Sequence, residues 1–162
     1  MNTADRQQYG PQARPVPFER GTDGPRVVLV GVDGTRTSLR AASYAAGLAR
    51  RQGARLVVVF VSSPATYTAL LSDVVADAVQ QSHDELAEDL RQECRRSAEE
   101  LDVPVTFLCR RGDAYVELSA AADETRADLV VVGSSEQAGH RLVGSVATRL
   151  VRTGRWPVVV VP

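Results

Sequence analysis

The chain is poor in aromatic residues and carries almost no net charge. Phe, Trp and Tyr make up 5% of its 162 residues, and 19 Lys and Arg nearly balance 20 Asp and Glu, for a formal net charge of −1. Few aromatics leave little surface on which nucleic acid bases can stack, and balanced charge creates no broad basic field for phosphates or anionic lipids. We therefore expect neither nucleic acid nor membrane partners.

Cysteine and histidine are also scarce, with two residues of each. Cys94 falls in a helical pattern and Cys109 in a strand pattern, with no C-x-x-C pair and no cluster of histidines beside them. This pattern favours buried, reduced thiols and no metal site. A disulfide or a metal site is the alternative that the two cysteines leave open.

The chain also lacks long apolar stretches. None is long enough to cross a membrane, and the first residues have no apolar segment of the kind found in signal peptides. Residues 1–25 are polar and contain four of the eight prolines. We predict a flexible N-terminal tail over residues 1–25, one domain over residues 26–162, and a cytoplasmic location.

From Arg26 onward, short apolar runs alternate with helical patterns. The runs are rich in valine and do not alternate with polar residues, which is typical of strands buried on both faces. They cover residues 27–32, 56–61, 105–109, 129–132 and 158–161. The alternation predicts the α/β class: a single doubly wound domain with a five-stranded parallel sheet in the order 3-2-1-4-5 and helices on both faces.

Residues that begin or end helices flank the helical patterns. Thr35 or Thr37 is a suitable N-cap for the first helix, and Gly53 is a suitable end. The clearest helical spacing of apolar residues follows Gln80, and Asp113 is expected to cap the helix after it.

In the predicted strand order, the connections reverse direction between the first and the fourth strand. Ligands of such sheets bind at this point, beyond the carboxyl ends of the strands. Asp33 and Gly34 follow the first strand, and Gly133, Ser134 and Ser135 end or follow the fourth. We therefore expect the functional site in the crevice between these two turns.

Three segments together resemble the universal stress protein family. Residues 30–35, with Ser38, match the first strand and its Asp-bearing turn, and residues 127–134 match the fourth strand and its glycine. Residues 143–147 and 157–161 match the start of the last helix and the terminal strand. The order and spacing of the segments make the resemblance specific. It implies a regulatory binding protein of the stress response rather than an enzyme.

The resemblance also implies an ATP or AMP site. Asp33 would hold the ribose hydroxyls, and the backbone of Val61 would meet the adenine. Gly133 and the Gly144-Ser145 pair would face the phosphates, because glycine lets a backbone approach closely and a helix N-terminus attracts anions. The implied nucleotide-binding residues are Gly31, Val32, Asp33, Val61, Gly133, Ser135, Gly144, Ser145 and Val146.

The loop before Gly144 departs from the nucleotide-binding pattern of the family. That pattern has a second glycine three positions after Gly133, where this chain has Glu136, and the loop here is two residues shorter. A carboxylate near phosphates repels them, whereas His140 and Arg141 offer hydrogen-bond donors. A different small anion or an empty crevice are the alternatives to a nucleotide.

The last strand is predicted to lie at an edge of the sheet, and an apolar edge strand favours pairing with another chain. The resemblance implies a homodimer in which this strand pairs with its copy across a two-fold axis. The interface residues would be Val158, Val159, Val160 and Val161. The alternative is a monomer in which the N-terminal tail covers this edge.

Motifs of several enzyme classes are absent. Neither the P-loop pattern G-x-x-x-x-G-K-[ST] nor the dinucleotide-binding pattern G-x-G-x-x-G occurs. A phosphate-accepting receiver domain needs an Asp after the third strand, where this chain has Arg110 and Arg111. These arginines either reach the crevice or remain on the surface. A very slow ATP hydrolase using Asp33 and Glu136 and a stress protein acting only through protein contacts stay open. Tyr67 is a candidate cover for a bound base.

Overall fold

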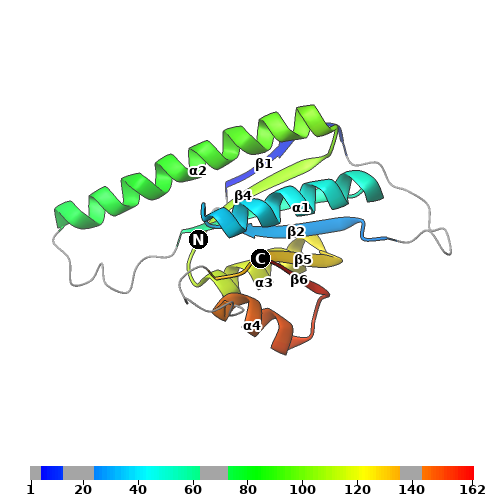
Figure 1. The fold of residues 1–162 in the computed structure, drawn as a ribbon. Coiled ribbons are helices and arrows are strands. Elements are labelled where there is room, and N and C mark those ends of the chain that lie inside the picture. The colour runs from blue at the N-terminus through cyan, green and yellow to red at the C-terminus, as the bar shows by residue number, and fades with distance from the viewer. Residues whose placement is uncertain (1–4, 13–23, 63–72, 136–143) are drawn as a thin grey trace.

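In the computed structural model, which describes residues 5–12, 24–62, 73–135 and 144–162, six strands form one sheet between two pairs of helices (Figure 1). The strands are β1 (Asp5–Tyr9), β2 (Val27–Val32), β3 (Arg55–Ser62), β4 (Val105–Arg111), β5 (Leu129–Gly133) and β6 (Val158–Val161). The helices are α1 (Arg36–Gln52), α2 (Asp73–Leu101), α3 (Ala114–Thr125) and α4 (Ser145–Thr153). Among the described residues, no helix is long and apolar enough to span a bilayer.

The five predicted strands are parallel and lie in the predicted order. The sheet runs β1-β4-β3-β2-β5-β6, and its last five members correspond to the expected order 3-2-1-4-5. β2 pairs with β3 on one side, with Val28 opposite Leu56, and with β5 on the other, with Val28 opposite Leu129. The first and fourth predicted strands are therefore neighbours, as the site prediction requires.

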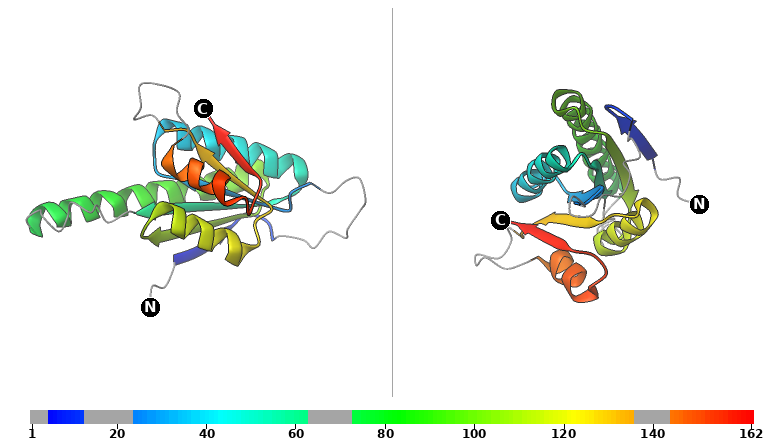
Figure 2. Two further views of the ribbon diagram at one scale, coloured as in Figure 1. Left: turned by 90° about the horizontal axis from the view of Figure 1, so that it is seen from below. Right: turned by 90° about the vertical axis from the view of Figure 1, so that its right-hand side faces the viewer.

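The prediction of a five-stranded sheet and of a flexible tail over residues 1–25 is wrong at residues 5–9. This segment forms β1, which pairs antiparallel with β4 and places Tyr9 opposite Val105 (Figure 2). Its sequence, DRQQY, has no apolar run because an edge strand is held mainly by backbone hydrogen bonds, and only alternate side chains face the protein. Gln7 and Tyr9 are half-buried, whereas Arg6 and Gln8 are exposed.

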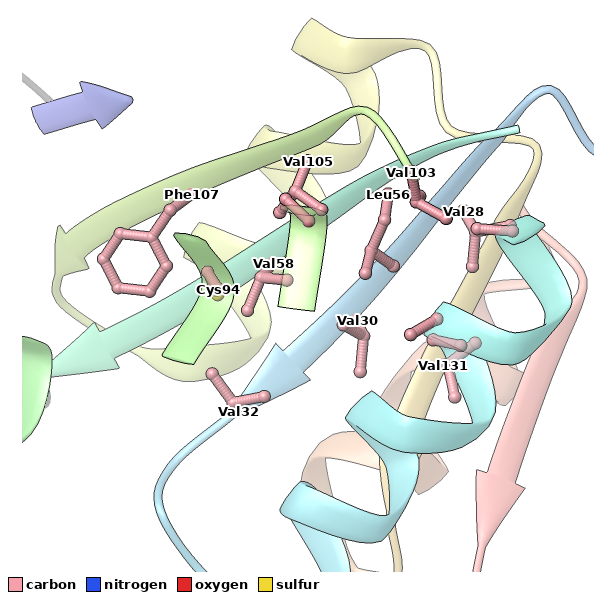
Figure 3. Packing of buried hydrophobic residues seen from close by; sticks show 14 of the residues in the cluster. Val28, Val30, Val32, Leu56, Val58, Cys94, Val103, Val105, Phe107 and Val131 are labelled. Atoms are coloured by element: carbon pink, nitrogen blue, oxygen red, sulfur yellow. The ribbon is translucent and has the colours of Figure 1, made fainter. Parts of the chain in front are cut away.

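Each face of the sheet has its own core. Val28, Val30 and Val32 point toward α1 and α2, where they pack with residues of β3 and β4 (Figure 3). Leu29 points to the opposite face, where Leu118 of α3 lies. Strands buried on both faces explain the unbroken valine runs in the sequence.

The two cysteines lie on a helix and a strand, as predicted, and no disulfide joins them. Cys94 of α2 is buried, and Cys109 of β4 is half-buried. Burial, with a smaller contribution from the nearby Glu93 carboxylate, raises the pKa of the Cys94 thiol to about 12. At neutral pH Cys94 is therefore a protonated, apolar packing residue.

The predicted helix caps are confirmed, and one helix is longer than predicted. Thr35 caps α1 by accepting a hydrogen bond from the Ser38 amide, and Gly53 ends that helix with a left-handed φ of 61°. Asp113 caps α3. The long helix α2 begins at Asp73, ahead of the pattern that follows Gln80.

The start of α1 packs directly on the end of β5. A Cβ atom at Gly133 would lie 2.7 Å from both the Ser38 nitrogen and the Thr37 carbonyl carbon. These neighbours are backbone atoms, which cannot rotate away as a flexible side chain can. A glycine is therefore required at position 133 for the helix and the strand to approach this closely.

We expect Gly133→Ala to lower the free energy of unfolding by about 1–3 kcal/mol, because the added methyl forces α1 away from β5. Urea unfolding followed by circular dichroism measures this change. The control is Gly47→Ala on the same helix, whose Cβ would meet only the flexible end of Arg51 at 3.2 Å. That change should be neutral or stabilising, because alanine favours a helix interior. Equal stability of the two variants would contradict the close-packing role of Gly133.

Candidate functional site

A pocket of about 460 Å³ opens at the carboxyl ends of β2, β3 and β5. It contains all nine of the residues predicted for the nucleotide site, which come from distant parts of the chain. The predicted residues are Gly31, Val32, Asp33, Val61, Gly133, Ser135, Gly144, Ser145 and Val146. The further lining residues are Thr35, Thr37, Ser38, Val59, Ala114, Leu118, Val132, Ser134 and Ala147.

The turn after β2 fixes the carboxylate of Asp33 at the pocket. Its Oδ1 accepts hydrogen bonds from the Thr35 amide at 3.0 Å and from the Thr35 hydroxyl at 2.6 Å. The Asp33 amide donates to Ser38 Oγ at 3.2 Å. Asp33 therefore stabilises the turn between β2 and α1. Because this role uses Oδ1, the second carboxylate oxygen is not needed for the turn.

Asp33 is an ionised acceptor at neutral pH. The surrounding protein desolvates its carboxylate, which raises the pKa, but the hydrogen bonds from Thr35 and Ser38 outweigh this effect. The net result is a pKa below the usual value for aspartate. A carboxylate of this kind binds hydroxyl donors well and accepts protons poorly.

A hydrogen-bonded chain connects the two sides of the pocket. Thr37 at the start of α1 donates its hydroxyl proton to the Ser134 carbonyl oxygen at 2.7 Å. The Ser134 amide in turn donates to the carbonyl oxygen of Val161 on β6 at 2.8 Å. The mouth of the pocket is thus held by α1, β5 and β6 together.

These hydroxyl residues are the part of the site that the sequence prediction missed. The sequence predicts Thr35 or Thr37 as a helix cap and Ser38 as part of a family motif, yet all three line the pocket. A signal was present in the sequence, since three hydroxyl residues within four positions directly follow the Asp33-Gly34 turn.

The N-terminus of α4 forms the opposite wall. Gly144 is its N-cap and supplies no side-chain hydrogen bond, and the first intrahelical bond runs from the Thr148 amide to the Gly144 carbonyl oxygen at 2.9 Å. The amides of Ser145, Val146 and Ala147 therefore precede the helical bonding pattern, while these residues line the pocket. This geometry favours a negative group beside them.

The floor of the pocket is apolar. Val59 and Val61 of β3 lie on the same face of the sheet as Leu118 of α3. Gly31 lets Leu118 pack close to the strand, because a Cβ at position 31 would lie 3.0 Å from both terminal carbons of Leu118. The floor is therefore formed by the valine side chains of β3 together with Leu118.

Charge in the pocket is sparse. Asp33 is the one charged residue among the described residues that line it. Arg110, which the sequence placed near the crevice or on the surface, lies outside the lining. Its side chain is 8% exposed and pairs with Glu117 and Glu124 of α3. Arg111 also lies outside the lining.

Other sequence-based candidates fall outside the described residues. These are Tyr67, Glu136, His140 and Arg141. In the part of the chain that the structure describes, no group of three or more His, Cys, Asp and Glu residues is arranged to hold a metal ion.

Comparisons with known proteins agree with the fold. The family model described as universal stress protein family matches residues 25–162. A universal stress protein of Methanocaldococcus jannaschii is 26% identical over 136 residues, which cover 83% of this chain and 80% of the relative.

Two solved structures are informative. A universal stress protein in complex with cAMP is 28% identical with a TM-score of 0.62, and the match covers 86% of this chain and 99% of that one. An Arabidopsis thaliana family member with AMP bound is 19% identical with a TM-score of 0.58, covering 85% of this chain and 91% of that one. Because the family model matches most of its length, the chain belongs to the universal stress protein family.

Proposed function

We propose that this protein is a regulatory homodimer of the universal stress protein family that binds an adenine nucleotide in the pocket between Asp33 and the N-terminus of α4. The observation that carries the proposal is the composition of the pocket: an ionised hydroxyl acceptor, an apolar floor and free helix amides enclose one space of about 460 Å³. Such a volume suits a small ligand. Relatives with cAMP and with AMP bound support the choice of nucleotide.

Each part of the nucleotide has a chemical counterpart in the pocket. The ribose hydroxyls would donate to the Asp33 carboxylate, whose turn is already fixed by Thr35. The adenine would lie on the apolar floor and meet the backbone at Val61. A phosphate would accept hydrogen bonds from the amides of Ser145 and Val146, where the helix favours an anion.

Charge favours a nucleotide with few phosphates. The described lining offers one anionic side chain and no cationic one, so each added phosphate charge gains only backbone donors while being repelled by Asp33. We therefore favour AMP or cAMP over ATP as the ligand. The low pKa of Asp33 also makes it a weak general base, which supports binding rather than hydrolysis.

The proposed site is tested by Asp33→Asn. The amide keeps an oxygen that can accept from Thr35, so the turn should survive, but the loss of the charge weakens the bonds to the ribose hydroxyls. We expect the affinity for AMP, measured by titration calorimetry, to fall about 10-fold or more. The matched control is Asp123→Asn, which alters a surface pair with Arg155 outside the pocket. Unchanged affinity in Asp33→Asn, or equal loss in both variants, would reject the site.

The homodimer proposal rests on the edge strand β6. Among the described residues, no strand pairs with the outer side of β6, because β1 occupies the opposite edge of the sheet (Figure 2). Residues 5–9 of the N-terminal tail, which form β1, therefore do not cover β6, and the tail residues 1–4 and 13–23 lie outside the described residues. The carbonyl oxygen of Pro157 accepts from the Val130 amide of β5, and that of Val161 accepts from the Ser134 amide just after β5. Since backbone groups alternate along a strand, those of Val158 and Val160 face outward and are available to a second copy.

Val160→Pro tests this interface. Proline removes the outward amide of residue 160 and leaves the bonds between β5 and β6 in place, which an edge strand tolerates. We expect the variant to sediment as a folded monomer under conditions in which the unaltered chain is a dimer.

The control for Val160→Pro is Val160→Thr, which keeps the amide and the β-branched shape. This variant should remain dimeric. A dimer that persists in Val160→Pro would show that another surface holds the two copies together.

A further inference from the structure

A second, larger pocket lies on the other face of the sheet. It has a volume of about 570 Å³ and runs between α1 and α2 over β2, β3 and β4. Five of its lining residues are labelled in Figure 3: Val32, Leu56, Val58, Cys94 and Val105. We refer to it as the α1–α2 groove. The nucleotide pocket belongs to the α3 and α4 face, so the two spaces are separated by the sheet.

Small side chains line part of the groove on both helices. On α1 these are Ala42, Ser43 and Ala46, and on α2 Cys94 and Ser97, while leucines of both helices complete the lining. Both helices pack on the sheet, and they make few close backbone contacts with each other. An open groove of this size with a mainly apolar lining can hold a small ligand.

The groove is elongated along the strands. One end is formed by Gly34, Leu39 and Leu86, and the other by Leu56 and Leu101. Leu56 lies opposite Val28, so the distance from Leu56 to the level of Gly34 is six residue steps, about 20 Å at about 3.3 Å per residue. Leu39 is 43% exposed at the end of this apolar surface. An extended hydrocarbon chain fits this shape better than a flat ring system.

The charged side chains of the groove are acidic. Asp89 and Glu93 stand one helical turn apart on the α2 wall, and the lining residues include no Lys, Arg or His. Glu93 is already paired with Arg96 and accepts a hydrogen bond from Ser97 Oγ at 3.2 Å. Asp89 has no such pairing among the described residues and is exposed to solvent. A positively charged head group complements this wall, and a carboxylate is repelled by it.

From this shape and charge we propose that the α1–α2 groove binds a single-chain apolar molecule with an amine head group, with the chain along the groove between the two helices and the amine beside Asp89. The proposal does not depend on the nucleotide site. It concerns different side chains on the opposite face of the sheet.

The test compares three probes of equal chain length, dodecylamine, dodecanol and dodecanoate, with the full chain and below their micellar concentrations. We expect dodecylamine to bind most tightly and dodecanoate least. Asp89→Asn should weaken dodecylamine about three- to tenfold and leave dodecanol unchanged, as expected for one partly solvated charge pair. The surface control Asp123→Asn should change neither.

Filling the groove gives an independent readout. Ala46→Leu and Ala42→Leu add a side chain to the α1 wall, and each should lower dodecylamine affinity at least tenfold without changing AMP binding. If either variant fails to fold, the other serves, and Asp89→Asn remains available at the surface. Equal affinity for the three probes, no binding of any, or binding unaffected by the filling variants would overturn the proposal.

Discussion

The backbone of the first turn of α1 packs directly against Gly133, and the arrangement of the pocket depends on this contact. With no side chain at position 133, the backbone of Thr37 and Ser38 lies directly on the end of β5. This approach brings the Asp33 turn, which belongs to the first parallel strand, beside the loop that follows the fourth. A larger residue at position 133 would move the two sides of the pocket apart, whether or not a ligand is bound.

The same contact connects the pocket to the edge of the sheet. Thr37 donates to the carbonyl group of Ser134, and the amide of Ser134 donates to Val161 at the end of β6. A ligand that orders the first turn of α1 therefore acts on a residue that also holds the edge strand. In the proposed homodimer, this short chain of hydrogen bonds would link nucleotide occupancy to the surface that pairs with a second copy.

Most of the sheet and the position of the pocket could be predicted because they follow from burial. The valine runs reveal strands covered on both faces, and the strand order then places Asp33 near Gly133. β1 could not be predicted, because an edge strand such as DRQQY pairs through its backbone and needs no apolar pattern. The α1–α2 groove could not be predicted from the sequence either. An alanine in a helix allows a neighbouring element to pack closely against it, but it leaves a groove where no neighbouring side chain reaches it. The sequence does not specify which of these applies at Ala42 and Ala46.

The most direct test of the proposed function is a calorimetric titration of the unaltered, full-length chain with AMP, cAMP and ATP under one set of conditions. We expect AMP or cAMP to bind at one molecule per chain and ATP to bind more weakly, because the described pocket has free amides for one phosphate and a carboxylate as its charged side chain. Heat from none of the three would contradict nucleotide binding. Tightest binding of ATP would contradict the role assigned to charge in this pocket.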